Sequence, residues 1–188
     1  MDELVDILDE EGNFTGQTAL KSVAHLEGLF HQTVHIWFCT SDGQLLLQQR
    51  GEKKDIHPLL WDVSVAGHIG TGEGIENAAL REIEEEIGIA VAKADLFKIG
   101  LFKSVQQHTN GLLDCEFHHT FLSELNVSFK TLRPQETEVA LLKLITLDDF
   151  SADVLEGKNP YAYVPHSRNY YRTVYTEVRN YLNSSTSD

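Results

Sequence analysis

Apolar residues recur along the chain in short runs that turn-forming residues separate. The run Leu4–Leu8 is followed by Asp9-Glu10-Glu11-Gly12-Asn13, and this order predicts a short opening hairpin. Six later runs have the length and residue types of strands, and they are Val34–Cys39, Leu45–Gln49, Val63–Ala66, Leu96–Val105, Leu112–Leu122 and Val139–Ile145.

Helical spacing occurs in three other segments. Residues 74–87 form the strongest one, with Leu80, Ile83 and Ile87 on one side and Gly88 as the stop signal. The stretch Thr146-Leu-Asp-Asp149 resembles a capping box that opens a short helix. An apolar stripe indicates a final helix, and its members are Tyr170, Val174, Val178 and Leu182. The polar residues 183–188 are expected to fray. The whole pattern predicts an α/β fold, a mixed sheet with helices on its faces.

The length and the charge narrow this picture. With 188 residues and 41% hydrophobic content, the chain suits one domain over residues 1–188, with an N-terminal hairpin extension (1–30) and a C-terminal helix and tail (165–188). Lys and Arg number 15 against 29 Asp and Glu, which gives a net charge of −14. Such a chain repels nucleic acid and anionic membranes, so neither is expected as a partner, whereas a small anionic substrate is compatible if metal ions mask the charge.

The location expected from the sequence is the cytoplasm. The start, Met1-Asp2-Glu3-Leu4, lacks the features of a signal peptide, and no apolar run approaches the ~18 residues of a membrane span. Cys39 and Cys115 lie in apolar runs, where buried free thiols are expected. The sequence leaves the oligomeric state open, and a homodimer is one option.

Three carboxylates stand out on the helix predicted for residues 74–87. At about 100° per residue, Glu82, Glu85 and Glu86 share one sector, whereas Glu84 points towards water. Like charges at these spacings repel, so they are tolerated on a solvated face or where a cation offsets them. Mg²⁺ and Mn²⁺ prefer such oxygen ligands. Arg81 can hold one of the carboxylates in position.

The flanking residues turn this run into a longer pattern. Gly67, Glu73, Arg81, Glu82, Ile83, Glu85, Glu86, Gly88 and Ile89 fill every specified position of a motif that resembles the Nudix box. The resemblance implies a Nudix α/β/α sandwich that hydrolyses a diphosphate linkage with Mg²⁺ or Mn²⁺. It implies metal binding by Glu82, Glu85 and Glu86, with the Gly67 carbonyl as a further ligand. It also implies catalytic roles for Glu82, Glu85 and Arg81, and a bracing role for Glu73.

A second resemblance covers roughly the first half of the chain, and it is to the isopentenyl-diphosphate isomerase-like group of that family. The segments that show this resemblance include Gly28-Leu29-Phe30-His31, Val34-His35-Ile36-Trp37 and Trp61-Asp62. Isomerases of this group carry a cysteine just before a Gly-His pair, whereas Ala66 stands before Gly67-His68 here. A methyl group cannot transfer a proton to or from carbon, so hydrolysis is favoured.

The isomerase metal positions have approximate counterparts. His31, His68 and Glu116, with His25 and Asp114, match them, which raises the hypothesis of a second metal or phosphate site. The alternative is that these histidines serve only packing or the surface.

Weaker candidates surround these motifs. Arg50 and Lys54 are expected to bind substrate phosphates, with Lys53 and Lys103 as further candidates and a solvated basic loop as the alternative. Glu136 and Glu138 precede a late strand, where they serve either as an extra base or ligand or as solvated residues. Trp37 and Trp61 are expected in the core.

Three functions are therefore weighed. The first is Mg²⁺-dependent hydrolysis of a small organic pyrophosphate, such as a nucleoside diphosphate derivative. The second is isopentenyl-diphosphate isomerisation, which Ala66 opposes. The third is a non-catalytic Nudix ligand sensor, which the intact carboxylate run opposes. The motif serves the diphosphate, so the group attached to it stays open.

Overall fold

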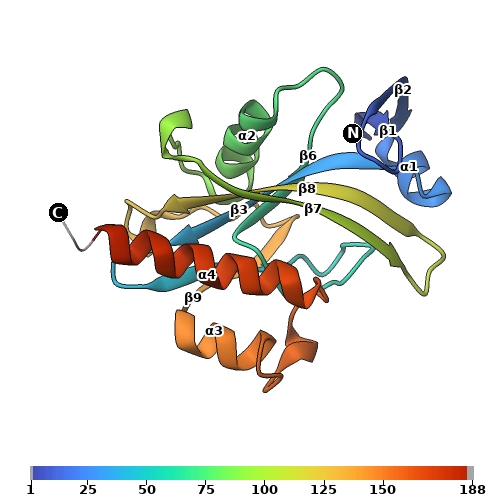
Figure 1. Ribbon diagram of the computed structural model, residues 1–188. Coiled ribbons are helices and arrows are strands. Elements are labelled where there is room, and N and C mark those ends of the chain that lie inside the picture. The colour runs from blue at the N-terminus through green and yellow to red at the C-terminus, as the bar shows by residue number, and fades with distance from the viewer. Residues whose placement is uncertain (1, 186–188) are drawn as a thin grey trace.

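The computed structural model describes residues 2–185 of the chain (Figure 1). Its strands are β1 (Leu4–Leu8), β2 (Phe14–Leu20), β3 (His31–Cys39), β4 (Gln44–Arg50), β5 (Trp61–Asp62), β6 (Val65–His68), β7 (Phe97–Gln107), β8 (Leu113–Glu124) and β9 (Val139–Thr146). Its α-helices are α1 (Lys21–Glu27), α2 (Ile75–Ile87), α3 (Leu147–Val154) and α4 (Arg168–Ser185). Single 3₁₀ turns lie at Lys93–Asp95, Phe129–Thr131 and Pro160–Ala162.

Strand β3 is the centre of the main sheet. On one side it pairs along its whole length with β8, in parallel. On the other side its partner changes, because residues 33–36 pair with β6 whereas Phe38 and Cys39 pair with β4. Strands β5 and β9 extend the sheet from β4, and β7 extends it from β8. The change of partner separates β4 from β6 and leaves room beside β3.

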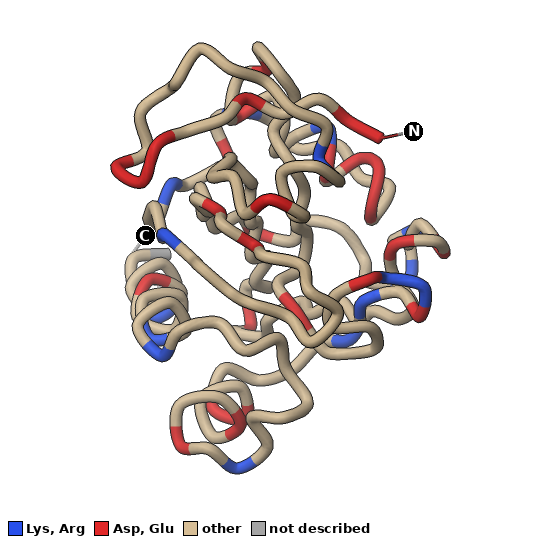
Figure 2. The backbone as a smooth tube through the Cα atoms, turned by 90° about the vertical axis from the view of Figure 1, so that its right-hand side faces the viewer, with Lys and Arg blue, Asp and Glu red and all other residues tan. Residues whose placement is uncertain are grey.

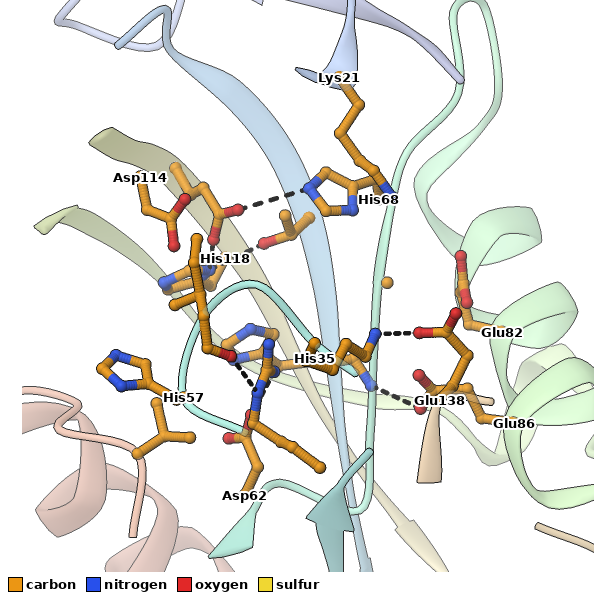
Figure 3. Close-up of a pocket in the computed structure, with 18 of the residues that line it drawn as sticks. Lys21, His35, His57, Asp62, His68, Glu82, Glu86, Asp114, His118 and Glu138 are labelled. Atoms are coloured by element: carbon orange, nitrogen blue, oxygen red, sulfur yellow. Dashed lines mark hydrogen bonds and ion pairs between the residues drawn. The ribbon is translucent and has the colours of Figure 1, made fainter. Parts of the chain in front are cut away.

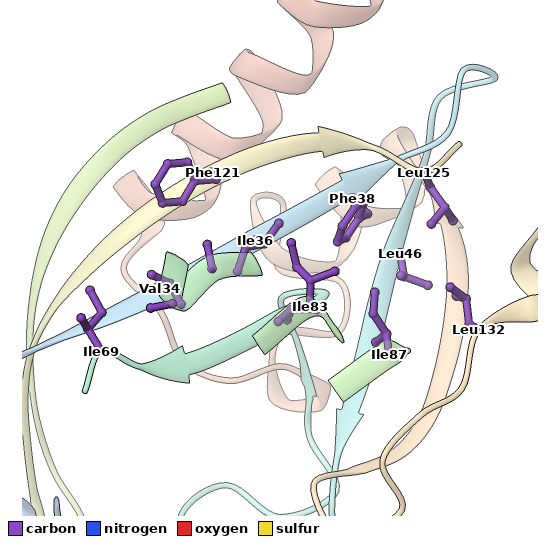
Figure 4. Close-up of a cluster of buried hydrophobic side chains, with 13 residues drawn as sticks. Val34, Ile36, Phe38, Leu46, Ile69, Ile83, Ile87, Phe121, Leu125 and Leu132 are labelled. Atoms are coloured by element: carbon purple, nitrogen blue, oxygen red, sulfur yellow. The ribbon is translucent and has the colours of Figure 1, made fainter. Parts of the chain in front are cut away.

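The two faces of β3 belong to different layers. Val34, Ile36 and Phe38 pack with Ile83 and Ile87 of α2 (Figure 4). Trp37 and Cys39 point the other way, into a core that α3 and α4 complete (Figure 1). This alternation follows from the two-residue period of a strand. The predicted α/β/α sandwich with a mixed sheet is confirmed.

Helix α2 is placed as the sequence predicts. It ends at Ile87, where Gly88 adopts a left-handed φ of 71° that favours glycine. Ile83 and Ile87 are buried as expected. Leu80 was expected beside them but is only half-buried, because the helix instead turns Ala79 to the sheet.

The elements near the two ends of the chain agree only partly with the sequence predictions. The opening hairpin is confirmed, as β1 pairs antiparallel with β2, but the short helix α1 had no sequence prediction. Thr146 caps α3 by accepting a hydrogen bond from the Asp149 amide, as the capping box predicts. Helix α4 reaches Ser185, so residues 183–185 are helical rather than frayed, and residues 186–188 lie outside the described part.

Acidic positions outnumber basic ones and occur in many segments of the chain (Figure 2). Both cysteines are buried and free. Of the helices in residues 2–185, none has the length and apolarity that a membrane crossing requires.

Candidate functional site

A cavity of about 380 Å³ opens beside β3, where β4 and β6 separate. Three groups of side chains line it, namely a carboxylate wall, a histidine cluster and a histidine chamber (Figure 3). The carboxylate wall consists of Glu82, Glu85 and Glu86 on α2. The histidine cluster consists of His25, His31, His68 and Glu116, of which His31 lies just behind the lining. The histidine chamber consists of His35, Asp62, His118 and His166.

The carboxylate wall is pressed against strand β6. Gly67 has no side chain where the Glu82 carboxylate lies, and a Cβ there would meet the Glu82 Cδ at 1.9 Å. Glu86 accepts hydrogen bonds at 3.1 Å from the Ala66 amide and from Gln48 Nε2. Glycine at position 67 is thus required because the helix brings a carboxylate onto the strand.

Burial and mutual repulsion oppose the ionisation of this wall. Glu82 and Glu86 are only 8% and 4% exposed to solvent. Burial, with the charge of Glu82 added, raises the pKa of Glu86 to about 8. Burial also raises the pKa of Glu82. A divalent cation would offset both costs, so these residues suit a metal ion.

Arg81 organises the wall from its solvent side. Its Nη1 donates to Glu82 at 2.6 Å and to the exposed Glu85 at 3.0 Å. Its Nε and Nη2 donate to the two oxygens of Glu73 at 2.9 Å. Glu73 also accepts from the Gly70 amide, so the loop before α2 is tied to the helix. Glu84 is exposed and does not line the cavity, as its place on the helix predicts.

The histidine cluster gathers side chains from α1, β3, β6 and β8. One atom, Glu116 Oε1, lies 3.4 Å from His31 Nε2, 3.5 Å from His68 Nε2 and 3.7 Å from His25 Nε2. One ligand atom from each of the four residues falls within 4.8 Å of all the others. Asp114 lies beside them, 3.7 Å from His25.

This cluster favours an ionised carboxylate at its centre. Although burial opposes it, the close approach of His25, His31 and His68 holds the pKa of Glu116 well below its usual range. His31 Nε2 is buried and makes no hydrogen bond among the described residues. Three imidazoles and a carboxylate form a donor set that Zn²⁺, Mn²⁺ or Fe²⁺ accepts. The residues present therefore suit a metal ion here as well.

The histidine chamber is the part that sequence reasoning missed. His35 and His118 stack at 4.1 Å between ring centroids, and His166 meets His35 edge-on at 5.3 Å. Asp62 is buried beneath them and accepts from His166 and Arg50, each at 3.0 Å. A sequence signal existed, because His31, Thr33 and His35, like Glu116 and His118, are spaced two residues apart along predicted strands and so share one face.

The weaker candidates divide into two groups. Arg50, Lys54 and Glu138 line the cavity, and Lys54 pairs with Glu138. Lys53 and Glu136 are exposed and do not line it.

Three further candidate residues lie outside the cavity lining. Lys103 lies elsewhere and donates to the Glu10 carbonyl, so it is not a phosphate ligand of this cavity. Trp37 is buried in the core as expected, whereas Trp61 is only partly buried, under the Lys143 ammonium.

Comparison with known proteins covers most of the chain. A family model described as NUDIX domain matches residues 29–168. An uncharacterized Nudix hydrolase of Clostridium acetobutylicum is 35% identical over 153 residues, which cover 80% of this chain and 73% of that protein. An isopentenyl-diphosphate Delta-isomerase of Nocardia farcinica is 30% identical over 162 residues, 86% of this chain and 88% of the isomerase. A crystal structure from Deinococcus radiodurans superposes with a TM-score of 0.61 at 20% identity, over 82% of this chain and 90% of the other.

Proposed function

Because the chain belongs to the Nudix family, we propose that it hydrolyses the diphosphate linkage of a small organic pyrophosphate with the help of Mg²⁺ or Mn²⁺. The observation that carries this proposal is the carboxylate wall, in which two buried glutamates face a cavity, with Glu82 held by Arg81 and Glu86 held by the Ala66 amide. The same intact wall argues against a non-catalytic ligand sensor.

Each part of the wall has a proposed role. A divalent cation, when bound, would supply charge neutralisation of the diphosphate and of the displacement. Glu82, Glu85 and Glu86 would hold it, with the Gly67 carbonyl as a further ligand. Glu82 also orients or deprotonates the attacking water. Arg81 positions the carboxylates, since it contacts Glu82 and Glu85 directly.

Arg50 and Lys54 are the proposed phosphate-binding residues. Arg50 donates hydrogen bonds from Nε to the Ile56 carbonyl and from Nη1 to Asp62. A guanidinium has five N–H donors, so others are left for a phosphate oxygen. Lys54 pairs with Glu138 at the cavity and can exchange that partner for phosphate. Both cations lie where they offset negative charge beside the wall.

We assign the histidine cluster to a second divalent cation. Its four donor atoms already converge, and its nitrogen content suits a softer ion than Mg²⁺. Asp114, which contacts both His25 and His108, supports the cluster from outside. Such an ion would lie beside His68, apart from Glu86 (Figure 3).

Hydrolysis is favoured over isomerisation by the residue next to the wall. Isomerisation needs proton transfer at carbon, and Ala66 offers no group for it. Cys115 does not replace the missing thiol, because Glu116 lines the cavity and its neighbour on the strand points to the opposite face. Cys115 instead lies near Gly28, outside the cavity lining.

A substrate panel tests the proposal. Nucleoside diphosphates, nucleotide sugars, dinucleotides and prenyl diphosphates would be incubated with Mg²⁺, with Mn²⁺ and with EDTA, and released phosphate and pyrophosphate would be measured separately. We expect at least one diphosphate to be cleaved with a metal ion and none with EDTA. Failure to cleave any member of a broad panel, or cleavage that persists in EDTA, contradicts the proposal.

A further inference from the structure

The histidine chamber contains a buried polar atom that the protein leaves unpaired. His118 is 4% exposed and lines the cavity, and its Nε2 has no hydrogen-bond partner among the described residues. Its other nitrogen, Nδ1, is 2.7 Å from the Thr33 hydroxyl. A buried polar atom without a partner is costly, so a group that fills the chamber gains by pairing with Nε2.

The carboxylate that belongs to the chamber is already paired. Asp62 is the carboxylate at its base, and three donors already occupy it, namely His166 Nε2, Arg50 Nη1 and its neighbouring amide, that of Val63. The guanidinium of Arg50 offsets the negative charge of Asp62. A second anion in contact with the Asp62 carboxylate itself would be repelled, and a cation would find that carboxylate already neutralised. An uncharged ligand group suits these surroundings.

The chamber also offers little apolar surface. Ile56, Val164 and Ala66 are the aliphatic side chains among the described residues that line the cavity. A hydrocarbon chain in the chamber would displace water and leave the imidazole nitrogens unpaired. A hydroxyl group both donates and accepts hydrogen bonds, so it can pair with an imidazole nitrogen in either tautomer. The chamber therefore matches an uncharged group that carries hydroxyls.

The chamber adjoins the carboxylate wall. In the sheet, His35 lies directly opposite Ala66, and the Ala66 amide donates to Glu86. Gly67, against which Glu82 rests, is the next residue. In Figure 3, Glu82 and Glu86 lie on one side of the cavity and Asp62 and His57 on the other. A diphosphate bound at the wall would direct its attached group into the chamber.

We propose that the histidine chamber binds the group attached to the diphosphate, and that this group is an uncharged, hydroxyl-bearing unit such as a sugar rather than a prenyl chain. This inference rests on the proposed function, because it extends the same cavity. His118 is the specificity-determining residue through Nε2, and Asp62 is a positioning residue that orients His166 and Arg50.

Two pairs of diphosphates test the ligand class. ADP-ribose and UDP-glucose represent sugar-linked diphosphates, and isopentenyl and geranyl diphosphate represent prenyl ones. We expect kcat/KM to be at least ~10-fold higher for the sugar-linked pair, since a site built for hydroxyls rejects analogues that lack them. Equal or better cleavage of the prenyl pair overturns the chamber proposal and leaves the proposed hydrolysis intact.

Substitutions at His118 locate the effect. His118→Asn keeps an amide near the Nδ1 position, where it can still meet Thr33, but it has no group at Nε2. His118→Gln extends an amide to the Nε2 position. We expect the Asn variant to lose ~10-fold in kcat/KM for the sugar-linked substrates, mainly through KM, and the Gln variant to recover part of that loss.

The neighbouring residue supplies a matched control. His119 lies on the same strand, is 5% exposed and also has unpaired ring nitrogens, but it does not line the cavity. His119→Asn should therefore leave the ratio of sugar-linked to prenyl cleavage unchanged. If the two Asn variants change that ratio alike, His118 does not determine specificity.

A binding measurement keeps the two proposals distinguishable. Calorimetric titration of the full chain with ADP-ribose and with geranyl diphosphate, in Mg²⁺, needs no turnover. We expect ADP-ribose to bind more tightly and His118→Asn to weaken it ~10-fold. If no diphosphate is cleaved but this pattern holds, the chamber proposal stands and hydrolysis fails. If geranyl diphosphate binds as well as ADP-ribose, the chamber proposal is wrong.

Discussion

The carboxylate wall and the histidine cluster line the same cavity but differ in how closely their ligand atoms converge. The four donor atoms of the histidine cluster lie within 4.8 Å of one another. On the wall, Glu82 and Glu86 are buried whereas Glu85 is exposed and drawn outward by Arg81. Two groups that both suit a metal ion thus differ in arrangement.

The difference follows from charge. Burial disfavours the ionised carboxylates of the wall, and repulsion from Glu82 adds to that cost, which is why the pKa of Glu86 rises to about 8. In the histidine cluster a single carboxylate, Glu116, attracts three imidazoles, so convergence is favourable before any ion binds. We therefore expect a bound cation to change the geometry of the wall more than that of the cluster.

The largest effect is expected when the wall loses a charge. Glu82→Gln and Glu86→Gln keep side-chain size but remove a ligand charge, so each should reduce turnover on the best substrate ~100-fold or more. Glu84→Gln lies on the same helix, exposed to solvent, and should change turnover little. Steady-state kinetics of the three variants checks this. If all three behave alike, the assignment of one helix face to catalysis is wrong.

Asp62 combines features of both groups, because it is buried like Glu86 but paired like Glu116. Burial opposes its ionisation, yet the His166 hydrogen bond and the charges of His166 and Arg50 hold the pKa of Asp62 well below its usual range. A lowered pKa contributes stability above the unfolded value of about 3.9, and this stability is lost as the pH falls further.

Asp62→Asn should therefore lower the free energy of unfolding at pH 7 by about 3 kcal/mol, the scale for breaking a buried ion pair. The difference from the unsubstituted chain should shrink below pH ~4, where the unfolded aspartate becomes protonated. Urea unfolding at pH 7 and at pH 3 measures both values. A difference that is the same at the two pH values would show that Asp62 contributes through packing alone.

A smaller effect is expected in the histidine cluster. Glu116→Gln keeps the side-chain shape and removes the central charge, so the affinity for Co²⁺, used as a spectroscopic probe, should fall by at least ~10-fold. Glu85→Gln, at the exposed end of the wall, should leave the cobalt spectrum of the cluster unchanged. If the Glu116 variant binds Co²⁺ as tightly as the unsubstituted chain, the cluster is not a metal site.

The same contrast explains what the sequence could predict. The wall lies on one continuous segment, where helix geometry places Glu82, Glu85 and Glu86 without tertiary information, and the strands and α2 follow from their apolar spacing. His25, His31, His68 and Glu116 come from four elements, so the family resemblance could only suggest that they meet. The chamber depends on the register of β3 with β6 and β8, which sets His35 beside Ala66 and His118 beside Thr33. No local pattern encodes that register.

The proposed function requires that this cavity hydrolyses a diphosphate and does not isomerise one. The direct measurement is product analysis of isopentenyl diphosphate after long incubation with Mg²⁺ or Mn²⁺, beside the hydrolysis panel on the same preparation. Because Ala66 cannot transfer a proton to or from carbon, we predict no dimethylallyl diphosphate, while phosphate or pyrophosphate is released from at least one other diphosphate. Robust formation of dimethylallyl diphosphate would contradict the account and would assign the cavity to isomerisation, with Glu116 as the group that replaces the missing thiol.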